Sequence, residues 1–305
     1  GVYDKARKTN KKINLFWLGV GTDDFLYGNA KEYMEFLDRK GIDNVQVFTS
    51  DKMGHTWMNA RYFLSETFPL LFNKEASKAA MKKAEAAKPA GKKAKEAPEA
   101  VPAARPDRQR LTPEVMAALF PPGVVSPEYH KDGSVTFRVH APNAEKVELE
   151  GQMFEGTKPM TKGDRGVWAV TITPDQPDIY PYSFIIDGTK IADPQNMHIF
   201  PNEGYKASLA DIKAPQPDPQ DLQDVPHGKV SYTYYTSKAV GFDRPVCIYT
   251  PAGYDPAGAE KYPVLYLIHG MTDTYETWFK VGRVNNILDN LIAAGLAEKM
   301  IVVMP

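Results

Sequence analysis

The chain has 305 residues, of which 43% are hydrophobic and 25% charged, which are ordinary values for a globular protein. Its formal net charge of −1 gives no support to nucleic acid or an anionic membrane as the main partner. The one cysteine, Cys247, excludes a disulfide within the chain, and no apolar run approaches the ~20 residues that span a bilayer. The first residues, GVYDKARKTNKK, lack the apolar core of a signal peptide.

Residues 1–73 show alternating strand and helix patterns. The run INLFWLGV at 13–20 is apolar throughout, as in a strand that is buried on both faces. Helical spacing of apolar residues follows over 30–40, then a short β-rich run over 44–49, then a second helical pattern over 58–72. This order predicts a parallel α/β sheet with functional residues at the carboxyl ends of its strands.

Residues 74–120 are predicted to be a linker. Lys, Ala, Glu and Pro dominate over 74–107, and a segment of this composition cannot bury enough apolar surface to offset its ordering entropy. Its first part, KEASKAAMKKAEAAK, has high helix propensity and favours a transient helix. A basic tail that binds nucleic acid is the alternative, which the interspersed glutamates disfavour.

Residues 121–213 have an all-β pattern. In GSVTFRVHAP, apolar and polar residues alternate from Val135 to His140, and GVWAVTI and YPYSFIIDG continue in the same manner. Several short strands separated by Gly, Pro and Asp turns predict an immunoglobulin-like β-sandwich. The aromatic residues Trp168 and Tyr182 either line a sugar-stacking surface or lie in the core, and the alternation does not separate these two interpretations.

From Val230 the chain returns to α/β character. RPVCIYTP predicts a strand, and YPVLYLIHG predicts a buried strand that ends at His269 and Gly270. A helix over 284–294 is followed by MIVVMP, the start of another buried strand.

Two stretches carry candidate catalytic residues. A serine esterase needs a nucleophilic serine, a histidine that takes its proton and an acid that fixes the histidine's tautomer. In α/β-hydrolases the chain order is serine, acid, histidine, and the pair Asp23-Asp24 and then His55 fit the second and third places. The alternative is that the acidic pair caps the following helix and that His55 is a surface loop residue.

The exit of the strand before His269 offers a second element of such a site. At this place a loop can present backbone N–H groups to the oxyanion of a tetrahedral intermediate, and the N–H of Met271, next to Gly270, is the candidate donor. The alternative is a plain glycine turn after a buried strand.

The nucleophile is missing from the chain. No serine has glycines two positions before and after it, so the Gly-x-Ser-x-Gly elbow is absent. Cys247 lies within a predicted strand and is interpreted as a buried hydrophobic residue. The histidines outside the candidate site are scattered without partners at ligand spacing, so neither a metal nor a cofactor is expected.

Both ends of the chain resemble carbohydrate esterase family 1, which holds feruloyl and acetylxylan esterases. NLFWLGVGTDDFLYGNAKEYMEFLDRKGI, followed by GHTW, resembles the family's C-terminal part, and the resemblance implies that Asp24 is the triad acid and His55 the base. RPVCIYTPAGYDPAGAEKYPVLYLIHGMTDTYETW resembles its N-terminal part, with the oxyanion loop after His269 and Gly270. The segments VTFRVHAPNAEKVELEG and YPYSFIIDGTKIADPQN resemble a family 48 carbohydrate-binding module.

The resemblance implies partial α/β-hydrolase pieces with a parallel sheet at both ends, which flank an all-β immunoglobulin-like sandwich. The expected divisions are the C-terminal part of one esterase domain at 1–73, the linker at 74–120, the sandwich at 121–213 and the N-terminal part of a second esterase domain at 214–305. The reversed order favours an internal window of a tandem esterase over a circular permutation, which would still contain the serine.

The expected function is therefore part of a serine esterase that acts on feruloylated or acetylated xylan, inactive as this chain alone. A siderophore esterase of the enterochelin type and a non-catalytic carbohydrate-binding or scaffold protein are the alternatives. The family resemblance implies a secreted, periplasmic or cell-surface location and a polysaccharide or oligosaccharide ester as partner. It gives no oligomeric state.

Overall fold

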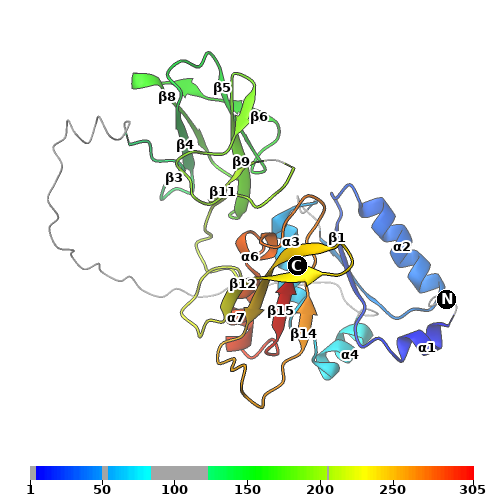
Figure 1. Cartoon of the computed structure of the whole chain (residues 1–305). Coiled ribbons are helices and arrows are strands. Elements are labelled where there is room, and N and C mark those ends of the chain that lie inside the picture. The colour runs from blue at the N-terminus through cyan, green and yellow to red at the C-terminus, as the bar shows by residue number, and fades with distance from the viewer. Residues whose placement is uncertain (1–4, 50–53, 84–122, 205) are drawn as a thin grey trace.

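The computed structural model describes residues 5–49, 54–83, 123–204 and 206–305. Figure 1 shows an N-terminal segment in blue, a β-sandwich in green and a C-terminal segment in yellow to red. Most of the predicted linker lies outside the described residues, apart from helix α4 (Lys74–Lys83), which agrees with the helix propensity there. None of the described helices has the length and apolar character that crossing a membrane requires.

The N-terminal segment alternates helices and strands as predicted. Its further elements are α1 (Ala6–Asn10), β1 (Trp17–Gly21), α2 (Tyr27–Arg39), β2 (Val45–Thr49) and α3 (Trp57–Thr67). Strands β1 and β2 pair in parallel, with Gly21 opposite Thr49 at their carboxyl ends. The strands that precede Asp24 and His55 in the chain therefore end side by side.

The sandwich consists of two antiparallel sheets. One sheet has the order β10-β9-β5-β6 with β11 also paired to β9, and the other has the order β3-β4-β8-β7. The strands are β3 (Glu128–Tyr129), β4 (Val135–His140), β5 (Val147–Gly151), β6 (Thr157–Pro159), β7 (Thr161–Lys162), β8 (Val167–Ile172), β9 (Ile179–Ile186), β10 (Thr189–Ile191) and β11 (Ser208–Asp211). Apolar side chains from both sheets, such as Phe137 and Leu149, form one core between them, as the alternating pattern predicts.

The two aromatic residues considered for sugar stacking lie in this core. Tyr182 is 1% exposed and Trp168 is 7% exposed. The Tyr182 hydroxyl donates to Asp193 Oδ2 at 2.7 Å, and Trp168 Nε1 donates to the carbonyl oxygen of Ala141 at 2.9 Å. Both rings are packed in the core, and their polar atoms are satisfied inside the protein. Tyr182 nevertheless also lines the cavity on the sandwich that is described below. Both residues therefore have a core role, and sugar contact at either position stays a prediction.

The C-terminal segment forms a four-stranded sheet with helices. Its elements are β12 (Lys229–Ser237), β13 (Phe242–Thr250), β14 (Val264–Tyr266), α6 (Thr277–Lys280), α7 (Val284–Ala293) and β15 (Ile301–Met304). The sheet order is β12-β13-β15-β14. Only β14 and β15 pair in parallel, because β12 and β13 form a hairpin and β13 runs against β15. The sheet is thus mixed, whereas a parallel sheet was expected at this end.

The N-terminal and C-terminal segments share one hydrophobic cluster. Leu64 and Phe68, in and just after α3, pack with Ile287 and Leu288 of α7 and with buried residues of β13 and β15. Figure 1 likewise places α3 among the C-terminal elements. The two ends were expected to belong to separate esterase domains, and in this structure they pack against each other.

Strand β14 lies at an edge of its sheet. Within the described ranges it pairs with β15 on one side and with no strand on the other. Tyr266 is 67% exposed, and Val264 and Ile268 also expose much of their apolar surface. The site described below lies at the carboxyl end of this edge strand.

Candidate active site

Asp24 and His55 form a hydrogen-bonded pair at the carboxyl ends of β1 and β2. His55 Nδ1 lies 3.1 Å from Asp24 Oδ2. The other carboxylate oxygen of Asp24 accepts the backbone N–H of Leu26 at 2.8 Å, which fixes the carboxylate in its turn. The Asp24 side chain is 9% exposed and that of His55 is 62% exposed, so the acid lies inward and the imidazole faces an open pocket.

The loop that carries His55 is held closely against the Asp24 turn. A Cβ atom at Gly54 would lie only 3.1 Å from the carbonyl oxygen of Asp23, so glycine permits this close approach. Asn59 Nδ2 donates to the carbonyl oxygen of Gly54 at 3.2 Å, and Asn59 Oδ1 accepts from Thr49 Oγ1 at 2.9 Å. These contacts tie the histidine loop to the end of β2.

A loop of the C-terminal segment faces this pair across a pocket of about 560 Å³. Gly270 and Met271, the predicted oxyanion loop, line the pocket together with Asp24 and His55. His269 does not line it, and its Nδ1 instead lies 2.8 Å from the carbonyl oxygen of Gly270. The structure thus brings together four of the predicted residues and leaves His269 outside the pocket.

Several pocket residues were not singled out from the sequence. Trp57 and Trp278 meet edge to face, with ring centroids 5.0 Å apart, and Trp278 Nε1 donates to the carbonyl oxygen of Ile268 at 3.0 Å. The sandwich adds Gln152, Phe200 and Asn202 to the same pocket. The two tryptophans could have been found from the sequence, because Trp57 ends the motif GHTW and Trp278 ends the motif that contains His269. The sandwich residues lie far from both motifs in the chain, so no local pattern points to them.

Asp273 brings a second carboxyl group to the pocket. Burial raises its pKa above the ordinary value, while the hydrogen bond from Asn202 and the nearby His269 and His55 act in the opposite direction. The Asn202 amide donates to Asp273 Oδ1 at 3.0 Å, so this carboxyl is oriented by the sandwich.

The pocket lining contains no serine or cysteine among the described residues. Cys247 lies in β13, is fully buried and forms no disulfide, which confirms its interpretation as a buried residue. Burial raises the pKa of its thiol to about 11, so the thiolate is scarce near neutral pH. The site therefore holds a carboxylate that is hydrogen-bonded to an imidazole, and the loop of Gly270 and Met271 lines the same pocket.

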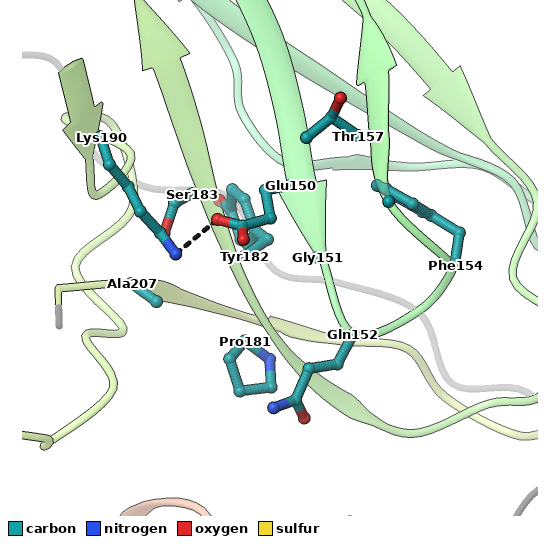
Figure 2. A pocket seen from close by; sticks show the side chains of 11 residues that line it. Glu150, Gly151, Gln152, Phe154, Thr157, Pro181, Tyr182, Ser183, Lys190 and Ala207 are labelled. Carbon is teal, nitrogen blue, oxygen red and sulfur yellow. Dashed lines mark ion pairs between the residues drawn. The ribbon is translucent and has the colours of Figure 1, made fainter. Parts of the chain in front are cut away.

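A second cavity of about 510 Å³ lies on the sandwich and adjoins the first, because Gln152 lines both. Figure 2 shows the Glu150 and Lys190 side chains paired above Pro181, with Gln152 and Phe154 on the connecting strand and loop. Thr157 and Ser183 add hydroxyl groups to its wall. This mixture of hydrogen-bonding groups and an aromatic ring suits a polar organic ligand such as a sugar.

Two family models match the chain. The model named Esterase matches residues 237–305, and that of carbohydrate-binding module 48, the isoamylase N-terminal domain, matches residues 124–202. The endo-1,4-beta-xylanase/feruloyl esterase of Xylanibacter ruminicola is 33% identical over 192 residues, which make up 60% of this chain and 26% of that relative. These findings confirm the resemblance to an esterase with a family 48-like domain, while the chain spans only about a quarter of the relative's length.

Solved structures of esterases are also similar. The ferric enterobactin esterase of Salmonella typhimurium is 20% identical, with 58% of this chain and 55% of that chain covered and a TM-score of 0.39. The feruloyl esterase module from Clostridium thermocellum, complexed with sinapinate, is 33% identical, with 30% and 31% covered and a TM-score of 0.27.

Proposed function

We propose that the chain is part of a serine carboxylic ester hydrolase that acts on ester-bearing plant polysaccharides such as feruloylated or acetylated xylan. The observation that carries this proposal is the Asp24–His55 pair, which faces the loop at Gly270 and Met271 across one pocket. The naming of the X. ruminicola relative as a xylanase and feruloyl esterase supports the substrate class. A secreted or cell-surface location fits a polymeric substrate and is part of the same proposal.

In the proposed mechanism, Asp24 accepts the Nδ1–H of His55 and so keeps the lone pair of Nε2 available. His55 takes the proton of a serine hydroxyl as that oxygen attacks the ester carbonyl, and later returns it to the departing alcohol. The backbone N–H of Met271 stabilises the oxyanion, a contribution of roughly 3–4 kcal/mol per donor. The serine comes from a segment that this chain does not contain.

The end segments are proposed to be the C-terminal part of one esterase domain and the N-terminal part of another, with the sandwich between them in the chain. The shared cluster supports this proposal, because Phe68 of the first part packs against α7 of the second, as complementary parts of one kind of domain would. The proposed boundaries remain 1–73, 74–120, 121–213 and 214–305.

This proposal is tested by comparing the chain alone with the chain joined to a serine-bearing esterase segment. The chain alone is expected to release no product from methyl ferulate or p-nitrophenyl acetate above the buffer rate, and a serine-directed phosphonate is expected not to label it. The joined protein is expected to hydrolyse methyl ferulate and feruloylated xylan in preference to a catecholate siderophore ester. Stoichiometric labelling of the chain alone would contradict the conclusion that it lacks the nucleophilic serine. Preferential hydrolysis of the siderophore ester would contradict the proposal that the substrate is a polysaccharide ester.

The sandwich cavity is proposed to hold the sugar side of the ester. Glu150→Gln is expected to weaken binding of a feruloylated xylo-oligosaccharide to the chain by about 3–10-fold, because a charged acceptor contributes more to a hydrogen bond than an amide. Methyl ferulate, which has no sugar, is expected to bind unchanged. Calorimetric titration measures both affinities.

The matched control is Glu128→Gln. Glu128 lies on β3 of the other sheet, pairs with Arg138 as Glu150 pairs with Lys190, and does not line the cavity. If both substitutions weaken oligosaccharide binding equally, the effect comes from the change in net charge. The cavity would then not be the sugar-binding site.

A further inference from the structure

One buried arginine joins the three parts of the structure. Arg61 lies on α3, and its guanidinium forms an ion pair with Asp178, just before β9 of the sandwich. Its second terminal nitrogen, Nη1, donates to the carbonyl oxygen of Val281 in the C-terminal segment at 2.7 Å. The side chains of Arg61 and Asp178 are 2% and 3% exposed, so this contact is sealed from water.

The arginine lies close to the candidate base. α3 begins two residues after His55, and Arg61 is in its second turn, so fixing Arg61 fixes the start of the helix. Trp57, at the first position of α3, also packs against a cluster of Phe200 and Val281. The ion pair with the sandwich thus restrains the first turn of α3, and through it the position of the His55 loop.

The sandwich also holds the loop opposite His55. Asn202 Nδ2 donates to Thr272 Oγ1 at 3.1 Å, and Glu203 N–H donates to the carbonyl oxygen of Thr272 at 2.7 Å. The carbonyl oxygen of Pro201 accepts from Thr277 Oγ1 at 3.0 Å. Thr272 has a φ of 66°, which a β-branched residue adopts only when its surroundings impose it.

We propose that the sandwich is a positioning element of the active site, in which Asp178 orients the His55 loop through Arg61 and Asn202 orients the Met271 loop. Holding the sandwich against the other two segments would not by itself require buried ion pairs and hydrogen bonds. An apolar pair seals an interface without desolvating a guanidinium, whose Nε here has no hydrogen-bond partner among the described residues. The directional contacts fall instead on α3, which follows the His55 loop directly, and on the Met271 loop.

The inference rests on the proposed function only in taking His55 as the base and Met271 as the oxyanion donor. Its test needs no ester hydrolysis. The ring nitrogen chemical shifts of His55 in the 305-residue chain report which of its two nitrogens carries the proton. We expect the wild-type chain to hold mainly the Nδ1–H form, because Asp24 accepts that proton.

The main variant is Arg61→Gln combined with Asp178→Asn, which removes both charges together and leaves no unpaired buried charge. We expect the fraction of the Nδ1–H form to fall at least about twofold, towards the Nε2–H form that free imidazole prefers. The matched control is Arg138→Gln with Glu128→Gln, an ion pair of the sandwich that touches neither loop. It is expected to leave the His55 signals unchanged.

Asn202→Ala is the second variant, and its readout is the backbone amide signal of Met271. We expect this signal to shift or broaden, while the control pair leaves it unchanged. A folded double variant with wild-type His55 signals overturns the proposal. If the double variant does not fold, an unchanged Met271 signal in Asn202→Ala overturns it instead. A failed esterase assay, by contrast, bears on the proposed function and leaves these signals as they are.

Discussion

Asp24→Asn and His55→Ala are each expected to lower kcat by at least ~10³-fold in a protein that joins this chain to a serine-bearing segment. His55 would be the only proton acceptor for the serine, and without the carboxylate of Asp24 its Nδ1–H tautomer is no longer favoured. Little change in KM is expected, because the lost interactions belong to the transition state. Steady-state hydrolysis of methyl ferulate measures both constants.

Asp23→Asn is the control for this prediction. The Asp24 carboxylate faces the imidazole and accepts the Leu26 N–H, so adjacent acidic residues have different environments. Asp23→Asn is expected to retain most of the turnover. If Asp23→Asn is the more damaging change, the assignment within the acidic pair is wrong. If neither substitution matters while His55→Ala does, the acid comes from another part of the fold.

Phe68→Ala is expected to destabilise the chain by about 3–5 kcal/mol, the usual cost of removing a fully buried phenylalanine. Phe68 is 1% exposed and lies in the cluster that the N-terminal and C-terminal segments share. Urea unfolding measures the loss, and hydrogen exchange locates it. Amide protection is expected to fall in α7 and β15 as well as in α3, because these elements bury the same side chain.

Phe137→Ala is the matched control, since Phe137 is fully buried in the separate core of the sandwich. Its effect is expected to be of similar size but to fall on the sandwich strands. Unchanged protection in α7 after Phe68→Ala would mean that the end segments are independent units and do not share a core. Limited proteolysis then should leave a stable fragment close to residues 121–213.

The local elements could be predicted because their signals are local. The apolar run over 13–20 and the helical pattern over 284–294 are short patterns with direct structural causes. β1 occupies the second half of that run, and α7 spans Val284–Ala293 as the pattern predicts. The proximity of the acidic pair to His55 followed from one further rule, that the ends of neighbouring parallel strands lie together. The choice of Asp24 over Asp23 came from the family resemblance.

The rest depended on contacts that no local pattern encodes. Arg61 and Asp178 lie 117 positions apart, and Arg61 resembles any polar residue on an amphipathic helix. Alternation places a strand residue on one face but does not say which face is buried, so Tyr182 was open to both a core and a sugar-binding interpretation. The mixed sheet likewise follows from the hairpin of β12 and β13, whose strand patterns fit either direction.

The uncovered side of β14 has a practical consequence for anyone who produces this chain. Among the residues that the structure describes, no strand pairs with the outer side of β14, which carries the exposed Tyr266 and is followed by the exposed Ile268. Such an edge strand is a template for pairing with another molecule. Self-association should therefore rise with concentration and start at this strand. A lysine in place of Ile268, one of the charges that natural edge strands use as a safeguard, should keep the purified chain monodisperse to higher concentrations in light scattering.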